Sequence, residues 1–248
     1  MQDHSPTETT DVDVTTVLAE VAASQRRLEQ TVAGLDEAAV RAPSPLEGWT
    51  RGHVLTHIAR NADSYWRLLE WARTGVEHPQ YAGVEAREAE IEEGADRSPA
   101  ELAADVRESA ARLAALAESL PHQAWGATVR ALQGWAHPAW YTLYRRWREV
   151  EVHHVDLDAG YTPADWPASY VRWELADSLL PLHAELPFSR VTATDLGLTL
   201  RLHDNGPALE GEGRHLLAWL TGRAADSPIT ATAPQWPSVP AFEGSQVP

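Results

Sequence analysis

Histidine and carboxylate side chains occur at helical spacing in two segments of the chain. The first segment carries four polar residues spaced by four, four and three positions, which places them on one face of a helix: His53, His57, Asn61 and Ser64. In the second segment, Glu149 and His153 are four residues apart, and Asp156 follows one turn later. A Glu/His pair at this spacing points both side chains toward a common point, and one histidine from a facing helix would complete a His₂–carboxylate set. That set is typical of a catalytic zinc or other divalent-metal site with an open coordination position.

The same spacing also has a simpler interpretation, because helical His and Glu residues four apart often form solvated pairs. His154 points away from the face that carries Glu149 and His153, and we expect it to be structural. His53 shares a face with His57 and could either support a ligand or lie at the surface. Six other histidines stand in expected loops or alone, where their spacing indicates no site: His78, His122, His137, His183, His203 and His215.

The composition excludes several other kinds of catalytic chemistry. The 248 residues include 20 Lys+Arg and 36 Asp+Glu, which gives a formal charge of −16, and the sequence has no cysteine and no lysine. A disulfide framework, a Cys-rich zinc site, a thiol nucleophile, a Schiff-base lysine and a Walker-type phosphate lysine are therefore excluded. Any thiol chemistry must use a thiol supplied from outside. The negative charge also argues against a nucleic-acid partner, since phosphate binding depends on clustered positive charge.

The rest of the composition is that of a globular protein with one large or two smaller domains. No apolar run approaches the ~18 residues that span a bilayer, and residues 1–16 are polar and acidic, without the pattern of a signal peptide. We therefore expect no membrane partner and a cytoplasmic location. Residues 1–12 are predicted to be a disordered tail.

Long helices are needed to position the two polar segments. Four segments have apolar residues at helical spacing and are predicted to be helices: 14–34, 50–74, 98–121 and 138–157. The second begins at Thr50, a good N-cap, and is stopped by Gly75. The third begins with Ser98, Pro99 and Glu101, a capping box with proline at the first helical position. A Trp-rich connection leads into the fourth.

Four long helices with two long connections predict an antiparallel bundle over residues 13–161. The acidic stretch 85–93 is expected to form a short exposed helix or an ordered loop. After Gly160 the pattern changes to a mixture of helix and strand, for which we predict these elements: helices 168–185 and 213–223, strands 191–194 and 198–202, a turn at Asn205-Gly206 and a Pro-rich loop from 234. The predicted fold class is therefore mainly α, with a small α+β domain over residues 162–248 after the bundle.

The motifs of this chain resemble those of a known family. The stretch 46–62, LEGWTRGHVLTHIARNA, is similar to the metal-binding helix of the DinB-like bundle superfamily and, more narrowly, to that of the mycothiol-dependent maleylpyruvate isomerases. Residues 148–157, REVEVHHVDL, resemble the second ligand segment of that family. EAREAEI at 85–91 and LAWLTGR at 217–223 are similar to two further family stretches. The resemblance therefore covers most of the chain, in the expected order.

The resemblance implies particular site residues. The metal ligands would be His57, Glu149 and His153, because the family's first ligand precedes an apolar-Ala pair, as His57 does here. The metal would be zinc, with the fourth coordination position left for water or for the thiol of mycothiol. Arg223 would reach the active site as a substrate-handling group. From its position alone, Arg223 could instead be a cation that satisfies the last carbonyls of its helix.

The activity implied by the resemblance is the isomerisation of maleylpyruvate to fumarylpyruvate, a step in the breakdown of aromatic compounds through gentisate. A zinc-activated thiolate would add to the cis double bond, the resulting single bond would rotate, and the thiolate would leave. Because the substrate is a dianion and the chain carries −16, we expect a locally positive pocket formed by Arg223 with Arg60 or Arg146. A mycothiol S-transferase, which shares the same motifs, and a non-catalytic metal-binding module stay open as alternatives.

Overall fold

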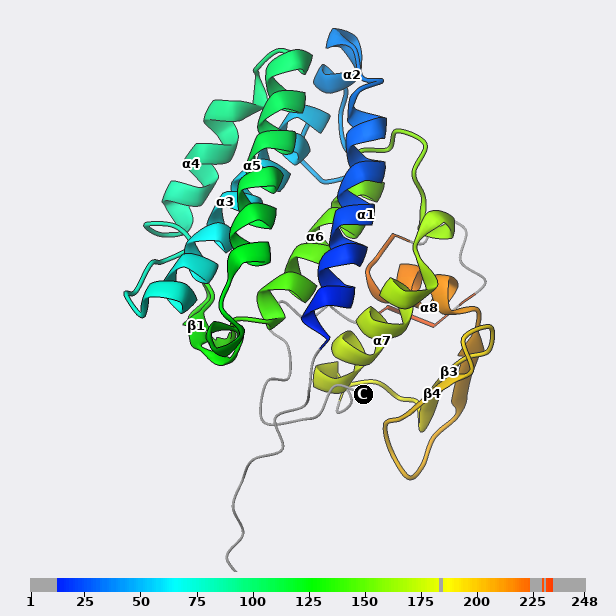
Figure 1. The fold of residues 1–248 in the computed structure, drawn as a ribbon. Helices are drawn as coiled ribbons and strands as arrows, with labels where there is room; N and C mark the ends of the chain where they lie inside the picture. The colour runs from blue at the N-terminus through cyan, green and yellow to red at the C-terminus, as the bar shows by residue number, and fades with distance from the viewer. Residues whose placement is uncertain (1–12, 183–184, 224–228, 230, 234–248) are drawn as a thin grey trace, which may run out of the picture.

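A computed structural model of the chain describes residues 13–182, 185–223, 229 and 231–233. The predicted disordered tail, 1–12, and the Pro-rich loop from residue 234 lie outside the described residues. The α-helices are α1 Val14–Val32, α2 Glu37–Arg41, α3 Arg51–Thr74, α4 Val84–Ala95, α5 Pro99–Ser119, α6 Tyr141–Asp156, α7 Ala168–Leu182 and α8 Gly213–Leu220 (Figure 1). The strands are β1 Thr128–Arg130, β2 Ala136–Pro138, β3 Arg190–Ala193, β4 Leu198–Arg201 and β5 Ala208–Gly211, and 3₁₀ turns span His122–Gly126 and Pro163–Asp165.

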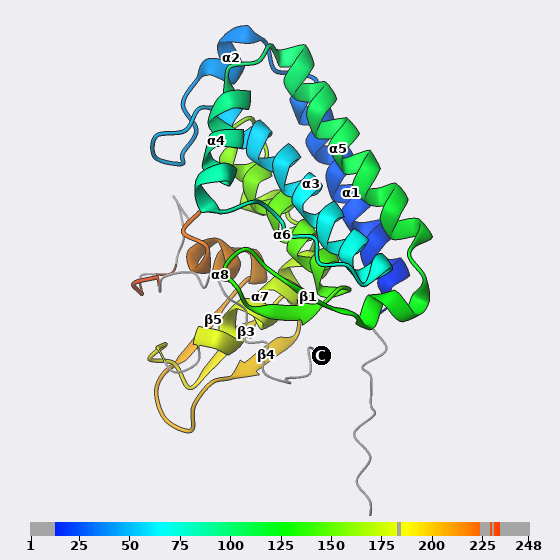
Figure 2. The same cartoon turned by 90° about the vertical axis from the view of Figure 1, so that its left-hand side faces the viewer.

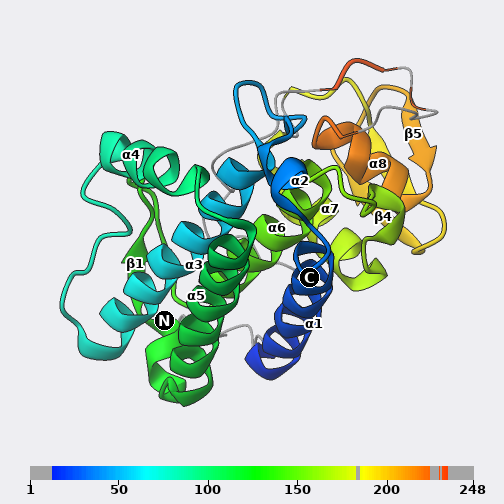
Figure 3. The ribbon, with the colours of Figure 1, turned by 90° about the horizontal axis from the view of Figure 1, so that it is seen from above.

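Helices α1, α3, α5 and α6 form a four-helix bundle, which Figure 3 shows from above. In it, α3 packs against both α5 and α6, and α1 also packs against both. The side-by-side helices α3 and α6 run in opposite directions, whereas α3 and α5 run in the same direction because α4 first returns the chain to the starting end (Figure 2). The predicted fold class, mainly α with a four-helix bundle followed by a smaller α+β part, is confirmed, but the bundle is not antiparallel throughout, because α3 and α5 run in the same direction.

The ends of the two best-marked helices lie where local chemistry predicts them. Thr50 is the N-cap of α3 and its hydroxyl accepts from the backbone N–H of His53, while Gly75 ends the helix with a left-handed φ of 72°. Ser98 and Glu101 form the capping box of α5, with proline in its first turn. Because α3 begins at its cap, the four polar residues of its first segment lie along one face, as their spacing predicts.

Helix α4 lies against α3 through two close contacts at glycine. A Cβ on Gly52 would stand 2.2 Å from the carbonyl oxygen of Ala95, and a Cβ on Gly94 would stand 2.5 Å from Cγ2 of Thr56. Any larger side chain at either position would push the two helices apart. Residues 85–93 lie within α4, so a helix and not a loop is present there, and the contact with α3 brings the inner face of α4 beside His57.

The C-terminal part forms a three-stranded sheet with strand order β4-β3-β5, in which β3 and β4 are antiparallel and β3 and β5 are parallel. The two strands expected at 191–194 and 198–202 are present as β3 and β4. Four of these helices and strands were not predicted: the short helix α2, the strand β5, and the strands β1 and β2, which form an antiparallel hairpin inside the Trp-rich connection. Each is short and too polar to give a periodic apolar signal.

Helix α6 contributes to three hydrophobic clusters. Leu143 and Val150 belong to two different clusters inside the bundle, whereas Trp147 and Val152 pack with residues of α7, α8 and β3. A buried ion pair strengthens the packing of α6 against α7, because Nε of Arg148 on α6 donates to Glu174 on α7 at 2.9 Å. None of the helices in the described ranges has the length and apolar character needed to cross a membrane.

Candidate metal centre and its pocket

His57 on α3 meets Glu149 and His153 on α6. Each of the three residues offers one ligand atom, and these atoms all lie within 4.8 Å of one another. Oε2 of Glu149 is 3.0 Å from Nε2 of His57 and 3.3 Å from Nε2 of His153. The two imidazole rings meet edge to face, with centroids 4.5 Å apart. The structure thus brings together the three residues that the resemblance implies as metal ligands, and we call them the His₂Glu cluster.

A buried arginine fixes the register of α6 against α3. Arg146 is 1% exposed, and its Nη1 donates to the carbonyl oxygen of Ile58 at 2.8 Å and to Oδ1 of Asn61 at 2.9 Å. Asn61 lies one turn beyond His57 on the same face of α3, and Arg146 lies one turn before Glu149 on α6. This anchoring therefore places Glu149 opposite His57.

His153 is oriented by a carboxylate on the side away from the cluster. Oδ2 of Asp156 is 2.9 Å from Nδ1 of His153, and Arg223 donates to both oxygens of Asp156, at 3.1 Å from Nε and 2.8 Å from Nη2. Burial favours the neutral acid, but the hydrogen bonds from His153 and Arg223 prevail and lower the pKa of Asp156. A carboxylate that accepts from Nδ1 leaves Nε2 to face the cluster, which is how proteins commonly orient a histidine metal ligand.

His57 has a different partner on its outer nitrogen. Nη2 of Arg87, on α4, lies 3.2 Å from Nδ1 of His57. Because a guanidinium only donates, Nδ1 accepts this bond, and the imidazole proton is on Nε2, from which it is donated to Glu149. Burial, followed by repulsion from His153, lowers the pKa of His57 to about 4. His57 is therefore neutral at pH 7.

The charges of the cluster suit a divalent cation. Burial acts to raise the pKa of Glu149, but hydrogen bonds from His153 and His57 bring it well below its usual value. Burial likewise acts to lower the pKa of His153, yet its hydrogen bonds to Asp156 and Glu149 raise it. Glu149 is therefore ionised and supplies a negative charge to the cluster. Two imidazole nitrogens and one carboxylate oxygen are ligands that zinc and other first-row metals accept, so the three residues fit such an ion.

Two further histidines near the cluster have structural roles. Nδ1 of His53 accepts from the backbone N–H of Thr50 at 3.2 Å, and its Nε2 lies 3.2 Å from Glu92, so His53 helps to cap α3 and contacts α4. The ring of His154 is stacked on that of Tyr161, with centroids 3.7 Å apart, and its Nε2 is 2.8 Å from Oγ1 of Thr31. Neither histidine belongs to the His₂Glu cluster.

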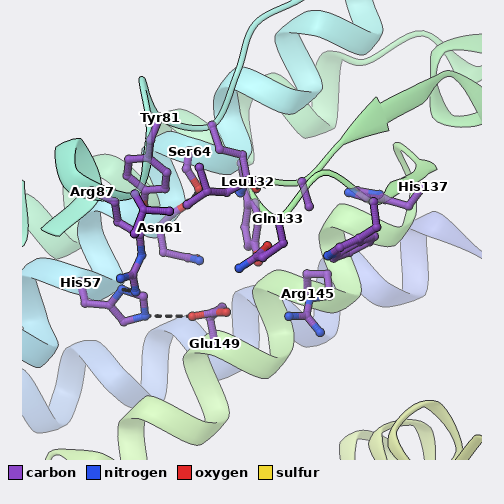
Figure 4. Close-up of a pocket in the computed structure, with 15 residues that line it drawn as sticks. His57, Asn61, Ser64, Tyr81, Arg87, Leu132, Gln133, His137, Arg145 and Glu149 are labelled. Atoms are coloured by element: carbon purple, nitrogen blue, oxygen red, sulfur yellow. Dashed lines mark hydrogen bonds and ion pairs between the residues drawn. The ribbon is translucent and has the colours of Figure 1, made fainter. Parts of the chain in front are cut away.

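A pocket of about 290 Å³ opens beside the cluster (Figure 4). Its walls come from α3, the residues before α4, α4 itself, the β1–β2 hairpin and α6. The lining residues are His57, Asn61, Ser64, Tyr65, Gln80, Tyr81, Val84, Arg87, Ala131, Leu132, Gln133, Trp135, His137, Arg145 and Glu149. The pocket therefore has His57 and Glu149 of the cluster and two guanidinium groups in its walls.

The arginines of this pocket differ from the expected ones. None of the three expected arginines lines the pocket. Arg60 pairs with Asp105 at 2.5 Å, and Arg146 is buried between helices. Arg223 hydrogen-bonds to Asp156, which in turn contacts His153 of the cluster. Arg87 and Arg145 line the pocket instead. A sequence signal for Arg145 exists, since Arg145, Glu149 and His153 repeat at four-residue spacing along α6. Arg87 lies within the similar stretch 85–91 but carries no spacing signal of its own.

Comparison with solved structures gives close matches over nearly the whole chain. A crystal structure of the mycothiol-dependent maleylpyruvate isomerase matches with a TM-score of 0.79 and 28% identity, covering 92% of this chain and 97% of that one. A histidine-to-alanine mutant of the mycothiol-dependent maleylpyruvate isomerase matches with a TM-score of 0.78 and 27% identity over the same shares of the two chains.

A more distant match concerns the fold alone. YfiT from Bacillus subtilis, a probable metal-dependent hydrolase with an unusual four-helix bundle topology, has a TM-score of 0.50 and 17% identity, covering 64% of this chain and 91% of its own. Comparison with curated protein sequences gave no match.

The family model of the mycothiol maleylpyruvate isomerase N-terminal domain matches residues 21–158, a stretch that holds all three residues of the His₂Glu cluster. The chain belongs to the mycothiol maleylpyruvate isomerase family.

Proposed function

We propose that the protein is a mycothiol-dependent cis–trans isomerase that converts maleylpyruvate to fumarylpyruvate. The observation that carries the proposal is the His₂Glu cluster beside an arginine-lined pocket, in a chain that matches the isomerase structure over 92% of its length. The cluster suits a metal that activates a thiol, and the arginines suit an anionic substrate.

His57, Glu149 and His153 would hold zinc or another divalent cation, which supplies a Lewis acid able to convert a bound thiol to its thiolate. This help is needed because a free thiol has a pKa of about 8.5 and is mostly protonated at neutral pH. The chain itself has no cysteine, so the thiol comes from a small molecule, which family membership indicates to be mycothiol.

The reaction is balanced without an oxidant or reductant. In the proposed reaction, addition of the thiolate sulfur to one carbon of the cis double bond would move the electron pair of that double bond to the conjugated carbonyl oxygen as an enolate. Rotation about the resulting single bond would follow. Collapse of the enolate would then form the trans double bond as the carbon–sulfur bond breaks and the thiolate leaves. Guanidinium groups in the pocket wall stabilise the transient negative charge.

The contacts of Arg223 support a positioning role in this reaction. Its two hydrogen bonds to Asp156 hold the carboxylate that orients His153. We therefore propose that Arg223 contributes to catalysis through Asp156 and His153, in place of the direct substrate contact that the resemblance implied. Replacement of Arg223 by Ala is then expected to weaken metal binding as well as turnover.

The direct test follows maleylpyruvate by ultraviolet absorbance with metal-loaded protein, with and without mycothiol, and measures the free thiol at the end. An isomerase changes the substrate only when thiol is present and leaves the thiol concentration unchanged over many turnovers. A mycothiol S-transferase consumes one thiol per substrate, so stoichiometric thiol loss would replace the proposal by that alternative. Absence of any thiol-dependent change with metal-loaded protein would overturn the isomerase proposal.

A further inference from the structure

The pocket beside the His₂Glu cluster contains two guanidinium groups and a single carboxylate. Arg87 comes from α4 and lies beside His57, whereas Arg145 comes from α6 and lies toward the β1–β2 hairpin (Figure 4). Glu149 is the carboxylate, and it already faces two histidines. Neither Arg87 nor Arg145 forms an ion pair with a carboxylate in the part of the chain that the structure describes. In a chain of charge −16, this pocket is locally positive.

Arg145 has an unused donor inside the protein. Its Nη1 is buried and has no hydrogen-bond partner among the described residues, and its guanidinium carbon lies 5.7 Å from the centre of the Trp135 ring. Buried polar groups in folded proteins are nearly always hydrogen-bonded, and a charged donor without a partner is especially costly. The unpartnered Nη1 of Arg145, beside a pocket, therefore points to an anionic ligand.

Arg87 has a partner that metal binding removes. In the structure its Nη2 donates to Nδ1 of His57, which requires the imidazole proton to be on Nε2. When Nε2 of His57 serves as a metal ligand, the proton of the neutral imidazole is on Nδ1. That nitrogen is then a donor facing another donor, so the hydrogen bond to Arg87 is lost. Formation of the metal site thus frees Arg87 for an anion in the pocket.

We propose that Arg87 and Arg145 bind the two carboxylates of a dicarboxylate substrate, one carboxylate each, and that Arg87 does so only when His57 is a metal ligand. The identity of the substrate as maleylpyruvate rests on the proposed function. A guanidinium holds a carboxylate through two parallel hydrogen bonds, so two separate arginines select a dianion over a monoanion of the same length.

The test is a binding titration with two unreactive probes, heptanedioate and heptanoate. Both have the seven-carbon chain of maleylpyruvate, but heptanoate lacks the second carboxylate. In zinc-loaded wild-type protein, calorimetry is expected to show heptanedioate binding at least tenfold more tightly than heptanoate. Arg87→Gln and Arg145→Gln are each expected to weaken heptanedioate binding tenfold or more. Arg107→Gln, which removes the same charge from an exposed position on α5, serves as the control and is expected to change nothing.

Metal-free protein supplies the second arm of the test. There Arg87 is held by His57, so Arg87→Gln is expected to change heptanedioate binding less than twofold, while Arg145→Gln keeps its tenfold effect. The variants Arg87→Lys and Arg145→Lys keep the charge but lose the two-point contact. They are expected to show intermediate losses, and they decide the outcome if a Gln variant does not fold.

Two results would overturn the proposal: equal affinity of wild-type protein for the two probes, or heptanedioate binding by both Gln variants as tight as that of wild type. Neither result depends on isomerase activity. If the arginine-dependent preference for the dianion is found but maleylpyruvate is not isomerised, the dicarboxylate site stands and the proposed function fails. If isomerisation is found without that preference, the proposed function stands and the site fails.

Discussion

Replacement of Asp156 by Asn is expected to weaken metal binding although every ligand stays in place. Asp156 is 2% exposed, accepts from Nδ1 of His153 at 2.9 Å and receives two hydrogen bonds from Arg223. Asparagine has nearly the same shape, and its carbonyl oxygen can still accept from His153. Its amide N–H₂ group, however, faces the donors of Arg223, and the negative charge is lost.

The size of this effect follows from the hydrogen bonds that change. A hydrogen bond to a charged group contributes about 1.5–3 kcal/mol and a neutral one about 0.5–1.5 kcal/mol, so the contact with His153 loses roughly 1–1.5 kcal/mol. Because 1.4 kcal/mol is tenfold in affinity, Asp156→Asn is expected to weaken zinc binding about tenfold. Asp156→Ala removes the contact altogether and is expected to reach about a hundredfold, the upper end for residues that orient metal ligands.

Competition with a chromophoric zinc chelator at fixed pH measures these affinities. Asp158→Asn is the matched control, since Asp158 carries the same charge two residues away, has its side chain 73% exposed and contacts Arg51. Its φ of 47° is also one that asparagine tolerates. Zinc binding by Asp156→Asn as tight as that of wild type would refute the orienting role. An equal loss in Asp158→Asn would show that net charge, not orientation, is responsible.

Substitutions in the scaffold around the site are expected to change stability. Gly52→Ala would place a Cβ 2.2 Å from the carbonyl oxygen of Ala95 and is expected to lower the free energy of unfolding by about 1–3 kcal/mol. Gly126→Ala is the control, because a Cβ there meets nothing within 4 Å. Equal melting temperatures of the two variants would contradict the close contact of α3 and α4. Arg148→Met leaves Glu174 and Asp177 buried without their cation, and urea unfolding is expected to show a loss of about 3–5 kcal/mol. Arg190→Met, in a half-exposed pair with Glu210, should cost less than about 1 kcal/mol, and similar losses in the two variants would be inconsistent with a buried pair. Burial lowers the pKa of His137 from 6.5 to about 4, so the unfolded chain binds a proton in this pH range that the folded chain does not. His137 alone is therefore expected to contribute a fall in stability of about 3 kcal/mol between pH 6.5 and 4, and His137→Asn to lose this part of the pH dependence. An unchanged slope in the variant would contradict the buried neutral state.

Features that depend on neighbouring residues were predictable from the sequence. Thr50 and Gly75 mark the ends of α3 because caps and left-handed glycines act within one turn of the helix. The four-residue spacing of Glu149 and His153 likewise predicts that both side chains point the same way. The choice of His57 over His53 came from the resemblance, and in the structure His53 caps α3 and pairs with α4 instead.

Features that depend on contacts between distant segments were not predictable in this way. Arg146 and Arg145 are adjacent in sequence, yet one is buried against the carbonyl oxygen of Ile58 and the other lines the pocket. Which of them faces the pocket depends on how α6 packs against α3. Arg87 reaches His57 only because two glycine contacts bring α4 close to α3. The contact of Arg223 with Asp156 joins residues 67 positions apart, and no local pattern indicates it.

We expect the His₂Glu cluster to support thiol-dependent isomerisation of a cis double bond. Proton NMR of the reaction mixture can follow this reaction, because the coupling between the two vinyl protons distinguishes the cis substrate from the trans product. Zinc-loaded wild-type protein with catalytic mycothiol is expected to convert maleylpyruvate to the trans isomer with the thiol recovered. The same protein without thiol, and His57→Ala with thiol, should leave the cis signals unchanged. Conversion by His57→Ala at the wild-type rate, or by wild-type protein without any thiol, would contradict this expectation.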